Sequence, residues 1–205
     1  MDKFEYVVAL AAVITGLGLS DVAVSLHRLL KRRGGVRWDW VPIVLSLYAA
    51  LVLMRLWYQL WSVRETPFVV DLPFVAVQVV QTLVLVLFAS AALPDEDDFK
   101  RGRIDLRRYY ARHRRYVWTT YLVFQLMWIA TAVYFYVYDG RQARLLEPAF
   151  LLYFALPILL TLAAIVGRRR VQVVALVLLV THEILIPSNL LGLRVTLTQF
   201  FAGGA

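Results

Sequence analysis

The amino-acid sequence predicts an all-α, polytopic integral membrane protein with six transmembrane helices. Hydrophobic residues make up 61% of the 205 residues, and the mean hydropathy of +0.68 is higher than soluble domains usually show. Six apolar runs each approach the roughly 20 residues that a helix needs to cross the hydrocarbon core of a bilayer. Basic blocks follow every second run, which is the charge pattern of a chain that crosses a membrane repeatedly.

The six runs cover about residues 4–26, 41–61, 68–93, 116–138, 148–166 and 171–191. We expect each run to be a helix, because lipid offers no hydrogen-bond partners to exposed backbone amides. Residues 1–205 then form a single membrane domain, with residues 94–115 as a cytoplasmic loop. The N-terminus carries Asp2, Lys3 and Glu5 rather than a basic start, so we expect a retained span and not a cleaved signal peptide.

The basic residues predict the orientation of the chain. Of the 22 Lys and Arg residues, five lie in Arg28–Arg37, eight in Lys100–Arg115 and three in Arg168–Arg170. The positive-inside rule assigns these blocks to the cytoplasm and both termini to the outside, in the plasma (inner) membrane. A net charge of +8 can also indicate a nucleic-acid partner. Because the blocks lie between spans, we expect anionic headgroups of the inner leaflet instead, and no nucleic acid.

The loop between the third and fourth runs contains a predicted amphipathic helix. Leu106, Tyr109, Tyr110 and His113 recur at the i, i+3, i+4, i+7 spacing of one helical face. We expect a short cytoplasmic helix that lies on the inner leaflet and runs into the fourth span. The alternative is a docking surface for a cytoplasmic partner, with the acidic residues 95–98 as a second patch.

Polar residues within the spans are the candidates for function. Asp21, Arg55, His182 and Glu183 are ionisable residues inside predicted spans, and Ser20 precedes Asp21. An ionisable group in the bilayer is costly, and such groups mark ion and substrate pathways. We therefore expect these five residues to be candidates for a transport or ion pathway.

Arg55 and Glu183 are predicted to form a structural ion pair. At 1.5 Å per residue, Arg55 lies about 21 Å and Glu183 about 18 Å from the inner ends of their spans. Asp71, near the outer end of the third span, is the alternative partner of Arg55. The pair either pins two helices together or serves as a gate or proton site. Pro187 adds a second feature, because its ring frees the backbone carbonyl of Glu183.

The first span contains a close-packing motif beside its carboxylate. Gly16 and Ser20 form a small-xxx-small pair, which lets another helix approach closely. Asp21 is either hydrogen-bonded within such a contact, to Ser25 or to the threonines at 119 and 120, or part of an ion or proton site reached from the cytoplasm.

The sequence offers no constellation for catalysis, a metal or a cofactor. It contains no cysteine. His182 and Glu183 begin an H-E-x-x-H pattern, but Ile186 stands where the second histidine would be. His27 and His113 lie near the predicted cytoplasmic side, so they do not match the depth of His182 as a haem ligand. We therefore expect no catalytic residue, no metal site and no cofactor.

Two functional hypotheses follow. The first is a small transporter or ion or proton channel that uses the buried polar residues as its path. The second is a non-transporting membrane scaffold or accessory subunit that binds a partner protein. Because 205 residues are short for a complete permeation unit, a homodimer or a membrane partner is expected. The sequence favours a protein that is not an enzyme.

Overall fold

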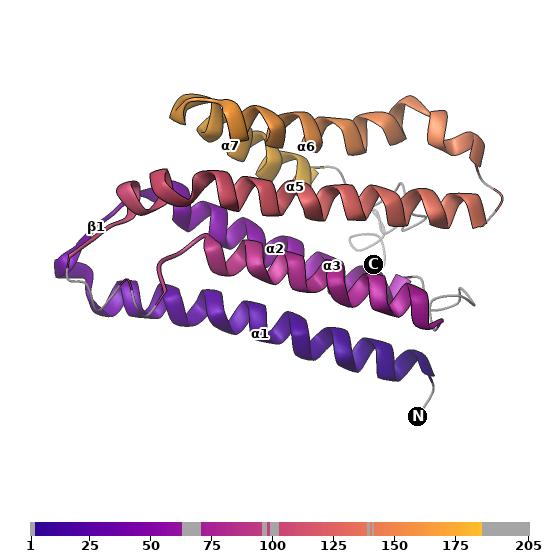
Figure 1. The fold of residues 1–205 in the computed structure, drawn as a ribbon, viewed down its shortest axis with the longest axis horizontal. Helices are drawn as coiled ribbons and strands as arrows, with labels where there is room; N and C mark the ends of the chain where they lie inside the picture. Colours follow the sequence, from indigo (N-terminus) through magenta and orange to yellow (C-terminus); the bar gives the residue numbers. More distant parts are fainter. Residues whose placement is uncertain are drawn as a thin grey trace, which may run out of the picture. The chain divides into compact units, whose positions relative to one another are not determined.

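The structure, a computed structural model, describes residues 3–62, 71–95, 98, 103–138, 140 and 142–185. These residues are mostly α-helical (Figure 1). The chain divides into two compact units, Met1–Met127 and Trp128–Ala205.

The first unit is a bundle of antiparallel helices. It contains α1 (Lys3–Lys31), α2 (Trp40–Ser62), α3 (Leu72–Ala91) and the first part of α5 (Leu106–Tyr138). The local sequence explains where α2 and α3 begin. The Asp39 carboxylate accepts a hydrogen bond from the backbone N–H of Val41 at 3.0 Å, which caps α2. Pro73 lies in the first turn of α3, where a missing N–H is tolerated.

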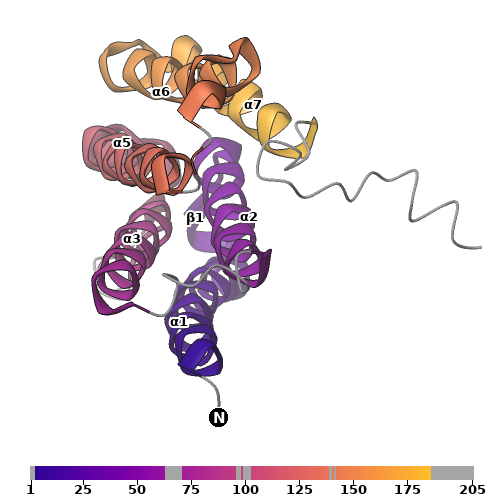
Figure 2. The ribbon, with the colours of Figure 1, turned by 90° about the vertical axis from the view of Figure 1, so that its right-hand side faces the viewer.

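Gly18 sets the distance at which α1 packs on its neighbours. A Cβ at this position would lie 2.8 Å from the Val86 side chain of α3 and 3.1 Å from that of Leu53 on α2. Only a glycine therefore fits without moving a neighbour. α1 contacts both α2 and α3, as the end view in Figure 2 shows.

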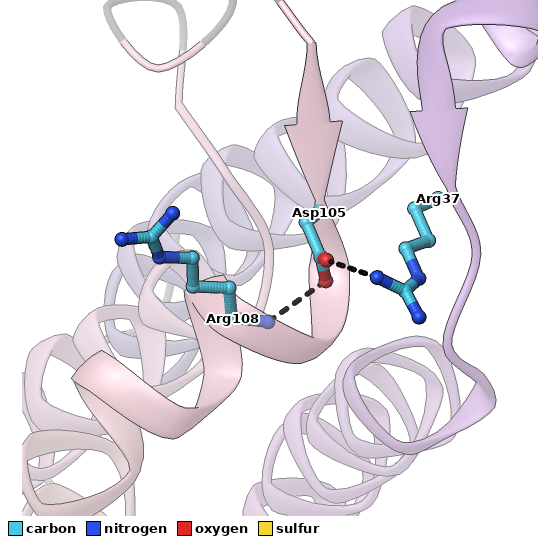
Figure 3. Close-up of polar contacts among 3 residues, drawn as sticks. All are labelled: Arg37, Asp105 and Arg108. Carbon is cyan, nitrogen blue, oxygen red and sulfur yellow. Dashed lines mark hydrogen bonds and ion pairs between the residues drawn. The ribbon is translucent and has the colours of Figure 1, made fainter.

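A short parallel strand pair ties one end of the first unit. β1 (Val36–Arg37) follows α1 and the 3-10 helix η1 (Arg33–Gly35), and β2 (Ile104–Asp105) precedes α5. Val36 pairs with Ile104, and Arg37 pairs with Asp105. The Asp105 carboxylate accepts hydrogen bonds from Arg37 at 3.4 Å and from the backbone N–H of Arg108 at 3.0 Å (Figure 3). The contact with Arg108 caps α5 and holds the pKa of Asp105 below its usual range, with a further contribution from Arg37.

Residues 106–115 are helical, as the periodicity predicts, and their cytoplasmic location stays a prediction. They form the first turns of α5, a continuous helix of 33 residues. At 1.5 Å per residue, α5 is about 50 Å long, well above the hydrocarbon thickness of about 30 Å. Its apolar face packs on protein: Leu106 is fully buried in a cluster with Leu29, Leu93 and Ile104. The periodicity identified the helix and its apolar face but not what covers that face.

The second unit contains the last part of α5, the 3-10 helix η3 (Gln142–Leu146), α6 (Pro148–Val166) and α7 (Arg169–Leu185). Aromatic rings fill its core, with Phe150 centred 5.3 Å from Tyr136 and 4.6 Å from Phe154. The turn between α6 and α7 requires Gly167, because a Cβ there would lie 2.5 Å from the Ala163 carbonyl oxygen. The Gln172 amide donates to the carbonyls of Ala164 at 3.0 Å and of Gly167 at 3.4 Å.

Among the described residues, four helices are long and apolar enough to cross a membrane: α1, α2, α3 and α5. α6 is also apolar, but it is shorter. The helix bounds follow the predicted runs closely, and α6 matches its run of 148–166. The end of the sixth run, with Ile186 and Pro187, lies outside the described residues. The prediction of a single membrane domain and of a cytoplasmic loop at 94–115 stays a prediction.

Candidate functional site

Three aromatic residues from three helices meet in the interior of the first unit. Tyr48 of α2 and Tyr121 of α5 share a hydrogen bond between their hydroxyl groups. Their ring centroids lie 5.6 Å apart in an edge-on arrangement. Phe88 of α3 stacks on Tyr121 with a centroid distance of 4.7 Å. We call these three residues the aromatic layer.

Polar side chains continue the same three helix faces on one side of the aromatic layer. Arg55 and Gln59 lie seven and eleven residues after Tyr48 on α2, and these spacings return to nearly the same helical face. Gln81 lies seven residues before Phe88 on α3, and Gln125 lies four residues after Tyr121 on α5. Because the helices alternate in direction, all four residues lie toward the end of the bundle where α2 ends and α3 begins (Figure 1).

The three glutamines of this set are buried, and each has amide atoms without a hydrogen-bond partner among the described residues. Gln81 has no exposed surface, Gln125 is 6% exposed and Gln59 is 8% exposed. Within the part of the chain that the structure describes, neither amide atom of Gln81 or Gln125 has a hydrogen-bond partner, and Gln59 Oε1 lacks one as well. An amide without a partner in a buried position costs about 1–3 kcal/mol of stability. We call Arg55, Gln59, Gln81 and Gln125 the amide surface.

The other side of the aromatic layer is closed by apolar packing. Leu45 of α2, Ala92 directly after α3 and Trp118 of α5 continue the same faces in that direction, and each is essentially fully buried. The Trp118 indole N–H donates to the Tyr110 hydroxyl at 2.8 Å, so its single polar atom is satisfied. The interior of the first unit is therefore polar on one side of the aromatic layer and apolar on the other.

A small cavity lies between α1, α2 and α3, and none of the four residues of the amide surface lines it. It has a volume of about 10 Å³, and its lining includes Ala11 and Ile14 of α1, Leu60 of α2, and Gln78 and Thr82 of α3. A cavity of this size has room for about one water molecule. The side-chain oxygen Oε1 of Gln78 has no partner among the described residues. The Thr82 hydroxyl donates to the backbone carbonyl of Gln78 at 2.7 Å.

Of the residues that the sequence singles out in the first unit, only Arg55 belongs to the amide surface. Its side chain is half-buried. Ser20 and Asp21 are exposed on α1, whereas Ser25 is buried. The Thr120 hydroxyl donates to the Tyr116 carbonyl of its own helix at 2.9 Å. Asp71 is exposed directly before α3.

His182 and Glu183 lie on α7 in the second unit. His182 is 8% exposed, and its ring centroid lies 5.4 Å from that of Tyr153 on α6. Glu183 is half-buried. The pairing of Arg55 with Glu183 or with Asp71 stays a prediction, as does a common path through these residues. Pro187, which would free the Glu183 carbonyl, is outside the described range.

Sequence reasoning missed most of the amide surface. It did not identify Gln59, Gln81 or Gln125 as candidate site residues. The signal was available, because a polar amide inside an apolar run is uncommon and is expected to face another helix or a cavity. The charged residues drew attention because hydropathy penalises a charge more strongly than an amide.

The geometry of the site fits binding rather than covalent chemistry. The described residues include no group of three or more His, Cys, Asp or Glu side chains that could hold a metal ion. Amides on the amide surface can donate and accept hydrogen bonds, but they neither titrate near neutral pH nor act as nucleophiles. No protein-family model, no curated protein and no solved structure matches the chain.

Proposed function

We propose that this protein is a small membrane transporter or channel of six spans that passes a polar solute through the interior formed by α2, α3 and α5. One observation carries the proposal. Gln81 is fully buried inside an apolar helix, and both of its amide atoms are without a partner among the described residues. A polar group of this kind in a membrane helix is expected to face a substrate, water or a cavity.

The arrangement of neighbouring residues supports a pathway rather than an isolated defect. Amide atoms without a partner among the described residues come from three helices, and these residues lie on faces that meet at the aromatic layer. A transport site open toward one side of the membrane needs such a polar region, and it needs a closure on the other side. The aromatic layer and the apolar packing around Trp118 supply that closure.

The charge distribution supports an orientation for the pathway. The block Arg28–Arg37 begins in the last turn of α1, and the described part of the block Lys100–Arg115, from Arg103 onward, leads into the first turns of α5, so both lie at the end of the bundle that β1 and β2 tie. With that end in the cytoplasm, both termini lie outside, and the amide surface opens away from the cytoplasm. Exposed arginines at this end, among them Arg37 and Arg107, favour contact with anionic headgroups of the inner leaflet.

The test is solute flux into proteoliposomes that contain the full chain. Gln81→Leu keeps the side-chain volume similar but removes the amide, so we expect it to abolish most of the flux. Val80→Leu is the matched control, because Val80 is the neighbouring residue on α3 and is 49% exposed. Equal flux from wild type and Gln81→Leu, or none from wild type across the solutes tested, contradicts the proposal.

The alternative function, a scaffold or accessory subunit, is favoured by the outer face of α1. Ser20 and Asp21 are exposed on this face, and a Cβ at Gly16 would meet no atom within 4 Å. An exposed carboxylate within a span is costly, and a glycine with open space around it in the described part of the chain lets another helix approach. We propose a second copy as the occupant, because the exposed small residues of one α1 helix can meet those of another at a symmetric contact.

The mass of the purified protein in detergent tests this contact. We expect wild type to have twice the protein mass of the monomer and Gly16→Leu to be monomeric, because leucine blocks the close approach. Val24→Leu is the control, since it changes an exposed residue of the same helix that is already large. A monomeric wild type would rule out the homodimer, and a stoichiometric membrane protein that co-purifies in its place would favour the accessory-subunit function.

A further inference from the structure

We infer that the solute of the amide surface is small and uncharged and that it both donates and accepts hydrogen bonds. This inference rests on the proposed transport function and narrows it to a substrate class. Water, urea and glycerol are members of this class that can be tested directly.

The chemistry of the glutamines gives the first argument. Each side-chain amide offers two N–H donors and one carbonyl acceptor, and it carries no net charge. Gln59, Gln81 and Gln125 therefore present donors and acceptors together on three converging helix faces. A solute with hydroxyl or amide groups can satisfy both kinds of atom, whereas an ion can use only one kind.

The charge of the surroundings gives the second argument. On the amide surface, the single charged group that the described residues contribute is the Arg55 guanidinium, which stays protonated at any physiological pH. A cation in this region would meet that positive charge. If a carboxylate balances Arg55, the surface is neutral overall, and neither a cation nor an anion recovers its lost hydration there. Both cases favour an uncharged solute.

Proton transfer is disfavoured by the same residues. Proton relays in membranes use chains of Asp, Glu or His side chains, which can gain and lose a proton. The amide surface has glutamines instead of such titratable side chains, and the aromatic layer next to it has two tyrosine hydroxyls and a phenylalanine. An arginine beside a narrow path also raises the electrostatic barrier to protons.

Close packing beside the amide surface sets an upper limit on solute size. Leu85 lies four residues after Gln81 on α3, Leu56 directly follows Arg55 on α2, and both are almost fully buried. The hydrogen-bonded tyrosines close the interior on the cytoplasmic side in the proposed orientation. A solute with more than a few non-hydrogen atoms would have to displace such buried side chains. We therefore expect permeability to fall from water to urea to glycerol.

Stopped-flow light scattering on proteoliposomes tests this inference. Osmotic shock with an impermeant solute measures water permeability, and shocks with urea and glycerol measure the entry of those solutes. Parallel fluorescence assays measure K⁺, Cl⁻ and H⁺ flux in the same vesicles. We expect wild type to pass at least water, with Gln81→Leu lowering its permeability by about fivefold or more, as the loss of one hydrogen bond in a barrier predicts.

The outcomes separate the inference from the function on which it rests. Flux of K⁺, Cl⁻ or H⁺ that depends on Gln81 would overturn the uncharged-solute class and leave transport intact. No Gln81-dependent flux of any tested solute would overturn both. Gln81→Glu adds a further test of the uncharged-solute class. A carboxylate at this position should lower the permeability of neutral solutes and should not raise it.

Discussion

Gln81 and Gln172 are both almost completely buried, but they differ in their hydrogen bonding. Gln172 is 1% exposed, and its amide donates to two backbone carbonyls at the turn between α6 and α7. Gln81 is fully buried on α3, and neither of its amide atoms has a partner in the described part of the chain. The same side chain at the same burial thus completes a structural turn in the second unit and leaves an open hydrogen-bonding site in the first.

The difference shows that burial alone does not identify a functional polar residue. The last carbonyls of a helix have no partner within that helix. Gln172 supplies one at the end of α6, which explains its presence without any function. Among the residues that the structure describes, Gln81 forms no hydrogen bond with a backbone group, so the described fold gives no structural reason for an amide there. The hydrogen-bond partners of each buried amide, rather than its polarity, separate the two roles.

The largest effect on stability is expected from Gln172→Leu. The substitution removes both hydrogen bonds and leaves the Ala164 carbonyl without its side-chain donor at a buried position. We expect a loss of about 2–3 kcal/mol in the free energy of unfolding. Unfolding in mixed detergent micelles, followed by circular dichroism, measures the change. Unaltered stability would mean that Gln172 is not the structural member of the pair.

Gln81→Leu is expected to act in the opposite direction in the same unfolding assay. The change removes an amide that has no partner and replaces it with an apolar group of similar volume. We expect the free energy of unfolding to rise by about 1 kcal/mol, because the desolvation penalty of the amide disappears. Combined with lost flux, higher stability would separate a functional residue from a structural one. Destabilisation comparable to that of Gln172→Leu would remove the distinction.

Two threonines provide a calibrated comparison with a smaller effect. The Thr82 hydroxyl in the first unit donates to the Gln78 carbonyl at 2.7 Å, and the Thr161 hydroxyl in the second unit donates to the Pro157 carbonyl at 2.8 Å. Both bonds lie within one helix and join residues four positions apart. We expect Thr82→Val and Thr161→Val each to change the free energy of unfolding by about 0.5 kcal/mol or less, since such bonds compete with existing helix bonds. A large effect at Thr82 alone would indicate that its hydroxyl also serves the neighbouring cavity.

The helices themselves could be predicted from the sequence, because each depends on a continuous apolar run. The predicted run of 41–61 compares with Trp40–Ser62 for α2, and that of 4–26 compares with Lys3–Lys31 for α1. α1 extends further because residues such as Leu29 and Leu30 continue the helix beyond the apolar window. The pairing of β1 with β2 could not be predicted, because Arg37 and Asp105 are 68 residues apart and each strand has only two residues.

The candidate site was harder to predict than the fold. Arg55 was identified because a charge in a span is conspicuous in the sequence. Gln81 and Gln172 look alike in sequence, and both lie within apolar runs. Their difference arises from tertiary structure: Gln172 faces a helix end with free carbonyls, whereas Gln81 faces the side chains of other helices. Local sequence contains no information on that difference.

Asp105 is a third kind of polar residue, partnered but accessible to water, and its removal should have the smallest effect. Its carboxylate caps α5 through the Arg108 N–H and contacts Arg37, whose side chain is 76% exposed. Because its pKa in the folded protein is lowered, the ionised form stabilises the fold above the ordinary pKa of about 3.9, and this contribution disappears as the pH falls through the lowered value.

Asp105→Asn should therefore lower the Tm slightly at pH 7 and have no effect on it in strong acid. Thermal unfolding of both proteins across this pH range measures the difference, with Arg37→Gln as the control that keeps the cap. A Tm difference that persists in strong acid would show that the charge of Asp105 is not what stabilises this end of α5.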